Sequence, residues 1–258
     1  MKLLNQKVDL SEFFEKIHRG SLLMLDYDGT LAPLVQKRDQ AYPYPGAIER
    51  VSKLMERKSN RLVIVSGRSL VDLEKLLGIS EIELWGSHGL ERKLPDGKMI
   101  LAPINEISKN GLERGIRACQ EVAEAQYCEI KPYSVALHWR GMDPEEAARI
   151  GSLVELKWNT ICSEYNFELH RFDGGIELRL RGQNKGDVVE ELLREVSKDI
   201  AIAYLGDDAT DEDAFARLGN RGLKVLVRKQ FRTTQADVHL IPPDDLLKFL
   251  DLWDAAYE

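Results

Sequence analysis

The chain has 258 residues, of which 43% are hydrophobic and 31% are charged. This length and composition are typical of a globular protein with one large domain, or with a medium domain that carries a smaller one. The net charge of -7 argues against nucleic-acid binding, because nucleic-acid-binding proteins are normally basic. The three cysteines form no CxxC pair, and we find neither a signal peptide nor a membrane-spanning apolar run. We therefore expect a cytoplasmic protein that binds no membrane.

Short apolar runs alternate with amphipathic stretches in the first hundred residues. The helix expected at 45–57 has Pro45 in its first turn, and Gly78 ends the helix expected at 69–77. The turn at 95–98 predicts a hairpin of two strands. The expected strands of this half are 21–25, 61–65, 82–85, 90–94 and 99–101.

The last third of the chain repeats this rhythm. Helices are expected at 184–196, at 210–218 with Thr210 as N-cap, and at 246–256. Strands are expected at 200–205 and 223–227. Strands that alternate with helices predict an α/β fold, a Rossmann-like doubly wound parallel sheet with helices on both faces.

The middle of the chain has a different pattern. Asp143, Pro144 and Glu146 are typical of a helix start with a capping box. A helix, two strands, a second helix and two more strands make an α+β unit, which we interpret as an inserted cap domain. The expected elements are a helix at 104–125, strands at 127–131 and 134–140, the helix after Asp143, and strands at 167–171 and 176–179 around a turn at 173–175. The predicted domains are a catalytic core at 1–103 and 181–258 and a cap at 104–180.

Polar residues follow two strands of the first half, where doubly wound sheets bind their ligands. Asp26 and Asp28 follow the strand at 21–25, with Gly29 after them. An EF-hand calcium loop would need further ligands that are missing, so a turn with acidic caps is the ordinary alternative. Ser66 follows the strand at 61–65, and a serine and a backbone amide there can bind a phosphate oxygen. Ser-Gly at a strand end is more often a simple turn.

Two further groups of polar residues lie in the last third. Lys185 opens a predicted helix, where the helix dipole disfavours a cation, and a solvated lysine is its ordinary interpretation. Asp207 and Asp208 precede a helix cap, so capping does not explain them. Carboxylates at one sheet edge repel one another unless a cation lies among them, and oxygen ligands suit Mg²⁺. No zinc-type His/Cys spacing and no nucleotide-binding glycine motif competes, so we predict a Mg²⁺ cofactor.

Taken in order, the four groups resemble the motifs of the haloacid dehalogenase superfamily, and the chain is more narrowly similar to the trehalose-6-phosphate phosphatases. The resemblance extends from about residue 22 to residue 227. One departure is Leu180, since the family usually has Pro at this position. The segments that carry the resemblance are 26–33, 66–68, 86–91, 131–140, 177–179, 184–186 and 206–213.

The resemblance implies a phosphatase mechanism. Asp26 is the expected nucleophile that forms an aspartyl phosphate, and Asp28 is the expected general acid and then base. Lys185 is the third expected catalytic residue, and it holds the phosphoryl oxygens together with Ser66. Further substrate-binding residues of the core are Gly67, Arg68 and His88. The expected metal-binding residues are Asp26, Asp28 through its main-chain carbonyl, Asp207 and Asp208.

The resemblance also implies a substrate. The expected reaction is hydrolysis of a small-molecule sugar phosphate, trehalose 6-phosphate, to trehalose and phosphate, with a trehalose-6-phosphate synthase as candidate partner. Another glycoside phosphate stays open as substrate (glucosylglycerol phosphate, mannosyl-3-phosphoglycerate or sucrose phosphate), and so does an inactive regulatory domain. The residues that match the family's sugar-contacting stretch are Glu129, Lys131, His138, Arg140 and Glu177. The ordinary alternative for these five residues is that they face water, as polar residues that alternate along a strand more often do.

Overall fold

The computed structural model describes residues 1–172 and 174–257. The chain forms two compact units, one of residues 1–100 and 183–258 and one of residues 101–182. We expect the first unit to be the catalytic core and the second to be the cap, and these roles remain predictions. Asp173, in the turn predicted at 173–175, lies outside the described residues.

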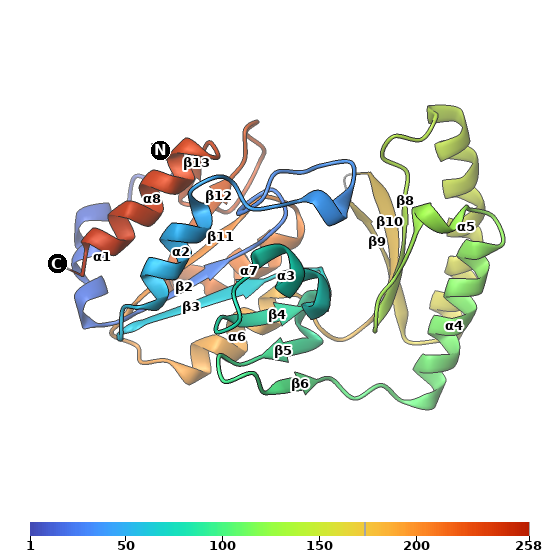
Figure 1. The fold of residues 1–258 in the computed structure, drawn as a ribbon, viewed down its shortest axis with the longest axis horizontal. Helices are drawn as coiled ribbons and strands as arrows, with labels where there is room; N and C mark the ends of the chain where they lie inside the picture. Colours follow the sequence, from blue (N-terminus) through green and yellow to red (C-terminus); the bar gives the residue numbers. More distant parts are fainter. Residues whose placement is uncertain (173, 258) are drawn as a thin grey trace. The chain divides into compact units, whose positions relative to one another are not determined.

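The first unit is built on a nine-stranded sheet with the order β1-β13-β12-β11-β2-β3-β4-β5-β6 (Figure 1). The strands from β13 to β4 in this order pair in parallel, whereas β1 is antiparallel to β13 and β5 is antiparallel to β4. This topology confirms the predicted α/β sheet. Its strands are β1 (Lys2–Leu3), β2 (Ser21–Leu25), β3 (Asn60–Val65), β4 (Glu83–Gly86), β5 (Glu91–Lys93), β6 (Met99–Leu101), β11 (Ala201–Gly206), β12 (Leu223–Val227) and β13 (Val238–Leu240).

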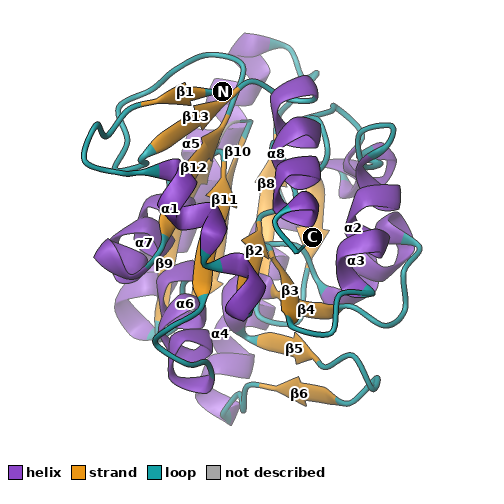
Figure 2. Ribbon diagram, turned by 90° about the vertical axis from the view of Figure 1, so that its left-hand side faces the viewer, coloured by secondary structure: helices purple, strands orange, loops and turns teal. Residues whose placement is uncertain are grey.

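Helices cover both faces of this sheet because its central strands are apolar on both sides. Leu23 and Leu25 of β2 join one buried cluster, and Leu22 and Met24 join another. The first cluster takes apolar residues of α1 (Leu10–Glu15), α2 (Ala47–Met55), α3 (Leu70–Leu77) and α8 (Asp244–Ala255). The second takes those of α6 (Lys185–Glu195) and α7 (Thr210–Leu218), and Figure 2 shows both layers. Short 3₁₀ turns lie at Ile17–Arg19, Arg38–Gln40, Ser87–Gly89, Ala125–Tyr127 and Gly219–Arg221.

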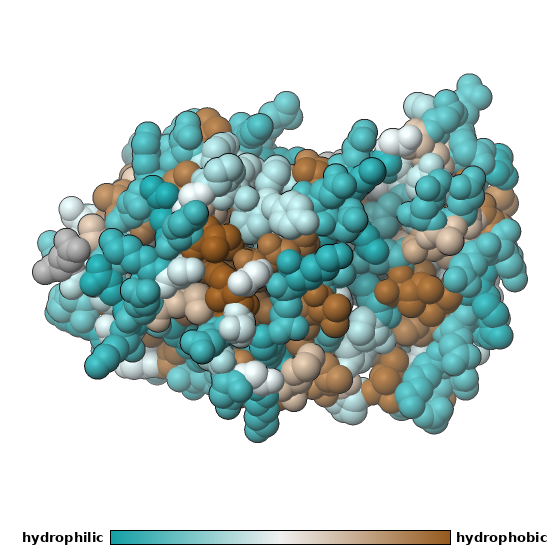
Figure 3. Space-filling model, viewed as in Figure 1, coloured by the Kyte–Doolittle hydropathy of each residue, from teal (hydrophilic) through white to brown (hydrophobic). Residues whose placement is uncertain are grey.

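The second unit is an antiparallel sheet with the order β7-β8-β10-β9, covered on one face by two helices. Val135, Leu178 and Trp158 are buried between sheet and helices, and the Trp158 indole N–H donates to the Gly115 carbonyl at 2.9 Å. The outer side of the helices is largely hydrophilic, as expected for amphipathic helices (Figure 3). The elements are α4 (Glu106–Gln120), β7 (Cys128–Ile130), β8 (Ser134–His138), α5 (Pro144–Glu164), β9 (Phe167–Phe172) and β10 (Gly175–Leu180).

Helix starts differ from the predictions at two positions. Pro45 lies before the N-cap of α2, which is Gly46 with a left-handed φ of 83°. Thr210 is the first residue of α7, and the predicted capping by its side chain is wrong. Asp143 does cap α5, where its carboxylate accepts two amide hydrogen bonds, but Glu146 pairs with Arg149. The sequence patterns also missed β1, α1 and β13, which are short and gain their stability from tertiary contacts.

Leu180 has a structural role that the usual proline of the family could not fill. Its main-chain N–H donates to the Tyr133 carbonyl at 3.0 Å, and proline has no N–H to donate. Leucine in place of proline therefore suits the end of β10, where the main-chain N–H of residue 180 is hydrogen-bonded.

Candidate active site

The candidate site lies at the carboxyl edge of the first unit's sheet. Asp26 follows β2, Ser66 follows β3 and Asp207 follows β11. The parallel registers pair Leu25 with both Ile64 and Leu205, so these three strands end at the same level. Asp26 is held there because its N–H donates to the Leu205 carbonyl at 2.9 Å. The topology thus brings together polar residues that lie far apart in the sequence.

Gly29 lets the turn after Asp26 pass close to Asp207. Its φ of 84° is left-handed, a region that glycine adopts easily and L-residues avoid. A Cβ atom added at Gly29 would lie 2.1 Å from Oδ2 of Asp207. Any larger residue would therefore displace the Asp207 carboxylate.

Lys185 points into the acidic cluster. Its Nζ lies 2.6 Å from Oδ1 of Asp26 and 2.7 Å from Oδ1 of Asp211, and its side chain is only 4% exposed. A capping box between Asn184 and Asp187 fixes the start of α6, which carries the lysine. Burial opposes the charge of Lys185, but the carboxylates of Asp211 and Asp26 outweigh it and raise its pKa. The lysine is therefore a buried, charged partner of Asp26 rather than the solvated residue of the ordinary interpretation.

Asp211 anchors the cluster through four hydrogen bonds. Its Oδ1 accepts from Lys185 and from the Tyr204 hydroxyl, the latter at 2.8 Å. Its Oδ2 accepts from the N–H groups of Asp207 and Asp208, both at 2.9 Å. A carboxylate has about four lone-pair sites, so Asp211 is saturated by these donors. The Asp at this position in the first turn of a helix looks like an ordinary helix-start residue in the sequence.

The described residues include one group of carboxylates that could hold a metal ion, formed by Asp26, Asp207 and Asp211 with oxygens within 4.8 Å of one another. Because Asp211 is saturated, the available ligand atoms belong to the carboxylates of Asp26 and Asp207. These hard oxygen donors fit Mg²⁺. The side chains of Asp28 and Asp208 bond elsewhere, Asp28 to Arg68 and Asp208 to the Ala209 N–H. Metal binding by Asp208, and by the Asp28 carbonyl, stays a prediction.

The electrostatics of this group favour a bound cation. Burial raises the pKa of Asp26, although Lys185 opposes this rise, and repulsion from Asp211 adds to it. Burial and repulsion from Asp26 and Asp211 likewise raise the pKa of Asp207 well above its usual value. Both carboxylates are therefore costly to ionise in the folded protein without an added positive charge.

The predicted phosphate-binding residues of the core also come together. The Ser66 hydroxyl accepts from the Arg68 N–H at 3.1 Å, and the Ser66 carbonyl accepts from the His88 N–H at 3.0 Å. Gly67 packs against the His88 ring, since a Cβ at Gly67 would lie 2.6 Å from two ring atoms. Arg68 makes a two-pronged ion pair with Asp28, both bonds at 2.6 Å. The arginine expected at the phosphate thus contacts the expected general acid in this structure.

Four of the five predicted sugar-contacting residues form a connected polar network within the second unit. Lys131 Nζ lies 2.9 Å from Glu177 Oε1 and 3.7 Å from Glu129 Oε2. His138 Nε2 lies 2.8 Å from Glu129 Oε2. Glu129 and Glu177 are both paired with Ala136 across neighbouring strands, so they share the sheet face opposite to the helices. The fifth residue, Arg140, packs against Gly174.

Two arginines near the cluster were not predicted. Arg228 Nη1 lies 3.3 Å from the Asp207 carbonyl oxygen and 3.7 Å from its Oδ2. Arg232 donates to the carbonyls of Asp207 and Asp208. Both lie in the segment between β12 and β13, where no spacing or motif in the sequence pointed to a site.

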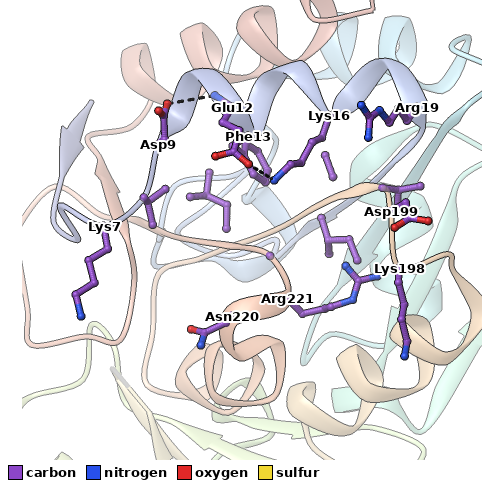
Figure 4. A pocket seen from close by; sticks show the side chains of 16 residues that line it. Lys7, Asp9, Glu12, Phe13, Lys16, Arg19, Lys198, Asp199, Asn220 and Arg221 are labelled. Carbon is purple, nitrogen blue, oxygen red and sulfur yellow. Dashed lines mark hydrogen bonds and ion pairs between the residues drawn. The ribbon is translucent and has the colours of Figure 1, made fainter.

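A cleft of about 490 Å³ opens at the other end of the sheet (Figure 4). Phe13 and Lys16 line it from the α1 region, and Arg221 and Asn220 line it just before β12. It includes the first residues of β11 and β12, whereas Asp207 follows the last residue of β11, roughly 20 Å away along the strand. This cleft therefore lies apart from the candidate active site.

None of the helices in the described part of the chain is long and apolar enough to cross a membrane.

Comparison with known proteins identifies relatives of the chain. A trehalose-phosphate phosphatase of Mycobacterium tuberculosis is 30% identical over 250 residues, which are 91% of this chain and 61% of the relative. An alpha,alpha-trehalose-phosphate synthase (UDP-forming) B of Dictyostelium discoideum is 30% identical over 202 residues, 77% of this chain and 25% of the relative. The chain thus spans less than two thirds of the length of these relatives.

A solved structure shares the fold. The C-terminal domain of the trehalose-6-phosphate phosphatase of C. albicans aligns with a TM-score of 0.81 over 99% of both chains, at 24% identity. The haloacid dehalogenase-like fold expected from the sequence is thereby confirmed. The trehalose-phosphatase family model matches residues 24–240. Because this match covers most of the chain, the chain belongs to the trehalose-phosphatase family.

Proposed function

We propose that the chain is a Mg²⁺-dependent phosphatase that hydrolyses trehalose 6-phosphate to trehalose and phosphate. The observation that carries this proposal is the buried cluster in which Lys185 bridges Asp26 and Asp211 beside Asp207, in a chain of the trehalose-phosphatase family. The similarity to trehalose-phosphate phosphatases supports the choice of substrate, and the residues of the cluster are suited to phosphate hydrolysis.

In the proposed reaction Asp26 is the nucleophile. Its Oδ2 attacks phosphorus while Oδ1 stays bonded to Lys185, so the attacking carboxylate is held in one orientation. The bond from phosphorus to the sugar oxygen breaks, and Asp28 gives that oxygen a proton. Water then attacks the aspartyl phosphate, Asp28 takes its proton, and phosphate leaves. Asp28 must leave its ion pair with Arg68 to do this.

The remaining core residues bind the phosphoryl group. Lys185 and Ser66 supply positive charge and a hydroxyl donor to its oxygens. Oδ1 of Asp26, which keeps a lone pair beside its bond from Lys185, and the carboxylate of Asp207 would hold Mg²⁺, with Asp208 and the Asp28 carbonyl as the further predicted ligands. The ion supplies charge that offsets the repulsion between carboxylate and phosphate.

We further propose that residues 101–182 form a cap that binds the sugar. Support comes from the network of Glu129, Lys131, His138 and Glu177 on one sheet face, since a disaccharide offers many hydroxyls to such charged groups. Arg140 is proposed as a fifth contact. We also propose that the protein is cytoplasmic and acts with a trehalose-6-phosphate synthase.

Phosphate release from a panel of sugar phosphates tests this function. Trehalose 6-phosphate should be hydrolysed fastest, with activity lost in EDTA and restored by Mg²⁺. Asp26→Asn should fold yet lose at least roughly a thousandfold in kcat, because it removes the nucleophile. A faster reaction with glucosylglycerol phosphate, mannosyl-3-phosphoglycerate or sucrose phosphate would reassign the substrate. No turnover of any compound would favour the inactive regulatory domain, a reading that the preserved Asp26–Lys185 pair argues against.

A further inference from the structure

We infer that Arg232 is a positioning residue for the proposed Mg²⁺ site, because it holds the main chain on which the Asp207 carboxylate stands. This inference rests on the proposed function, since it assigns a residue to that same site. Arg232 itself touches neither the Asp26 carboxylate nor the Asp207 carboxylate in any contact of the described residues, so its effect passes through the backbone.

Arg232 spans two successive carbonyl groups. Its Nε donates to the Asp207 carbonyl at 3.1 Å, and its Nη2 donates to the Asp208 carbonyl at 2.7 Å. The guanidinium group is planar, and its donors point in fixed directions, so one side chain can fix both carbonyls at once. A lysine has a single nitrogen on a flexible stem and lacks this geometry.

The opposite side of the same loop is fixed by Asp211. The N–H groups of Asp207 and Asp208 both donate to its Oδ2 at 2.9 Å. Both main-chain donors and both acceptors of the two residues are therefore bonded, the donors to Asp211 and the acceptors to arginine. A loop held on both sides has little conformational freedom left to lose when a metal binds.

Arg232 is in turn held in place by Glu212 of α7. Its Nη1 lies 2.5 Å from Glu212 Oε1, and Glu212 also accepts from the Thr234 hydroxyl at 2.7 Å and the Gln235 N–H at 2.9 Å. The segment after β12 is thus tied to the first turn of α7. This arrangement fixes the guanidinium against the loop even though the segment has no regular secondary structure.

The charge of Arg232 allows a test by sign. A cation near a divalent metal site weakens metal binding by repulsion, so a role as a mere charge predicts tighter Mg²⁺ binding when Arg232 is neutralised. A positioning role predicts weaker binding instead. Arg228 is the matched comparison, because it is also a cation beside Asp207 but contacts only one of the two carbonyls.

The experiment is calorimetric titration of Mg²⁺ into metal-free wild-type, Arg232→Gln, Arg232→Lys and Arg228→Gln proteins. We expect the Kd for Mg²⁺ to rise about tenfold or more in Arg232→Gln, as for other residues that orient metal ligands. Arg232→Lys should be weakened similarly, whereas Arg228→Gln should bind Mg²⁺ as tightly as the wild type or more tightly. Circular dichroism in EDTA checks that each variant is folded.

Unchanged or tighter Mg²⁺ binding by Arg232→Gln would overturn the inference while leaving the proposed function intact. Absence of Mg²⁺ binding by the wild type would instead overturn the proposed function itself. If Arg232→Gln fails to fold, Arg232→Lys serves in its place, because it keeps the positive charge but cannot hold both carbonyls. That variant should also bind Mg²⁺ more weakly, and wild-type affinity in it would contradict the positioning role.

Discussion

A carboxylate whose lone pairs are all engaged cannot bind a metal, and this separates the roles of neighbouring acids in the cluster. Asp211 accepts four hydrogen bonds, so it orients Lys185 and the Asp207–Asp208 loop. Asp26 gives only one oxygen to Lys185 and keeps the other for chemistry. Identical side chains a few ångströms apart thus differ in function because their donors differ.

The space at Gly29 leads to a prediction at the same scale. Gly29→Ala should weaken Mg²⁺ binding at least about tenfold, because the new Cβ would displace the Asp207 carboxylate. Gly97→Ala is the control, since Gly97 has a similar φ of 85° but no atom within 4 Å of an added Cβ. Both variants carry the same backbone strain, and only Gly29→Ala should lose Mg²⁺ affinity in calorimetric titration. Equal affinity in the two variants would show that the close approach to Asp207 does not matter.

At the scale of helices and strands, the sequence was informative wherever a local pattern sets the structure. Apolar runs located β2, β3 and β11, and parallel strands necessarily end at one edge, so the meeting of Asp26 and Lys185 could be anticipated. The N-cap of α7 could not, because its loop is fixed by Asp211 rather than by Thr210. Strands β1 and β13 pair the chain's two ends across more than two hundred residues, which no local pattern encodes.

Strand register also lay beyond the sequence. The pairing of both Glu129 and Glu177 with Ala136 places two acids on either side of a small residue, with Lys131 between them. Alternation along each strand showed that these residues could share a face, but not which positions lie opposite one another. Arg228 and Arg232 were also missed, because their partners Asp207 and Asp208 are distant in sequence and no local pattern links them.

The polar network gives a prediction for these strands. Glu177→Gln should lower kcat/KM for trehalose 6-phosphate about ten- to a hundredfold, because it removes a charged hydrogen-bonding group worth roughly 1.5–3 kcal/mol. Hydrolysis of p-nitrophenyl phosphate, which has no sugar, should change only a few-fold. Glu121→Gln is the control, because Glu121 forms an exposed ion pair with Lys157 between the helices. Equal losses on both substrates would assign Glu177 to folding or to the chemical step.

Over the whole molecule, the buried carboxylates couple stability to pH. Burial raises the pKa of Asp26 from 3.8 to about 8, against the pull of Lys185. The pKa of Asp207 is raised in the same direction. The folded protein therefore holds these protons more tightly than the unfolded chain does. The resulting stabilisation is complete below about pH 4 and is lost as the pH rises toward 8.

Mg²⁺ should reverse this loss, because it binds the deprotonated carboxylates. With Mg²⁺ at about 100 times its Kd at pH 8, binding adds roughly 2.7 kcal/mol to the free energy of unfolding, or about 5–10 °C in Tm. At pH 6 the protons compete, so the Mg²⁺-induced rise should shrink to about 2 °C or less. Thermal unfolding with Mg²⁺ and with EDTA, from pH 5.5 to 8.5, measures this difference. Asp207→Asn should lose most of the rise at every pH, and an equal rise at pH 6 and pH 8 in the wild type would show that the metal does not bind these carboxylates.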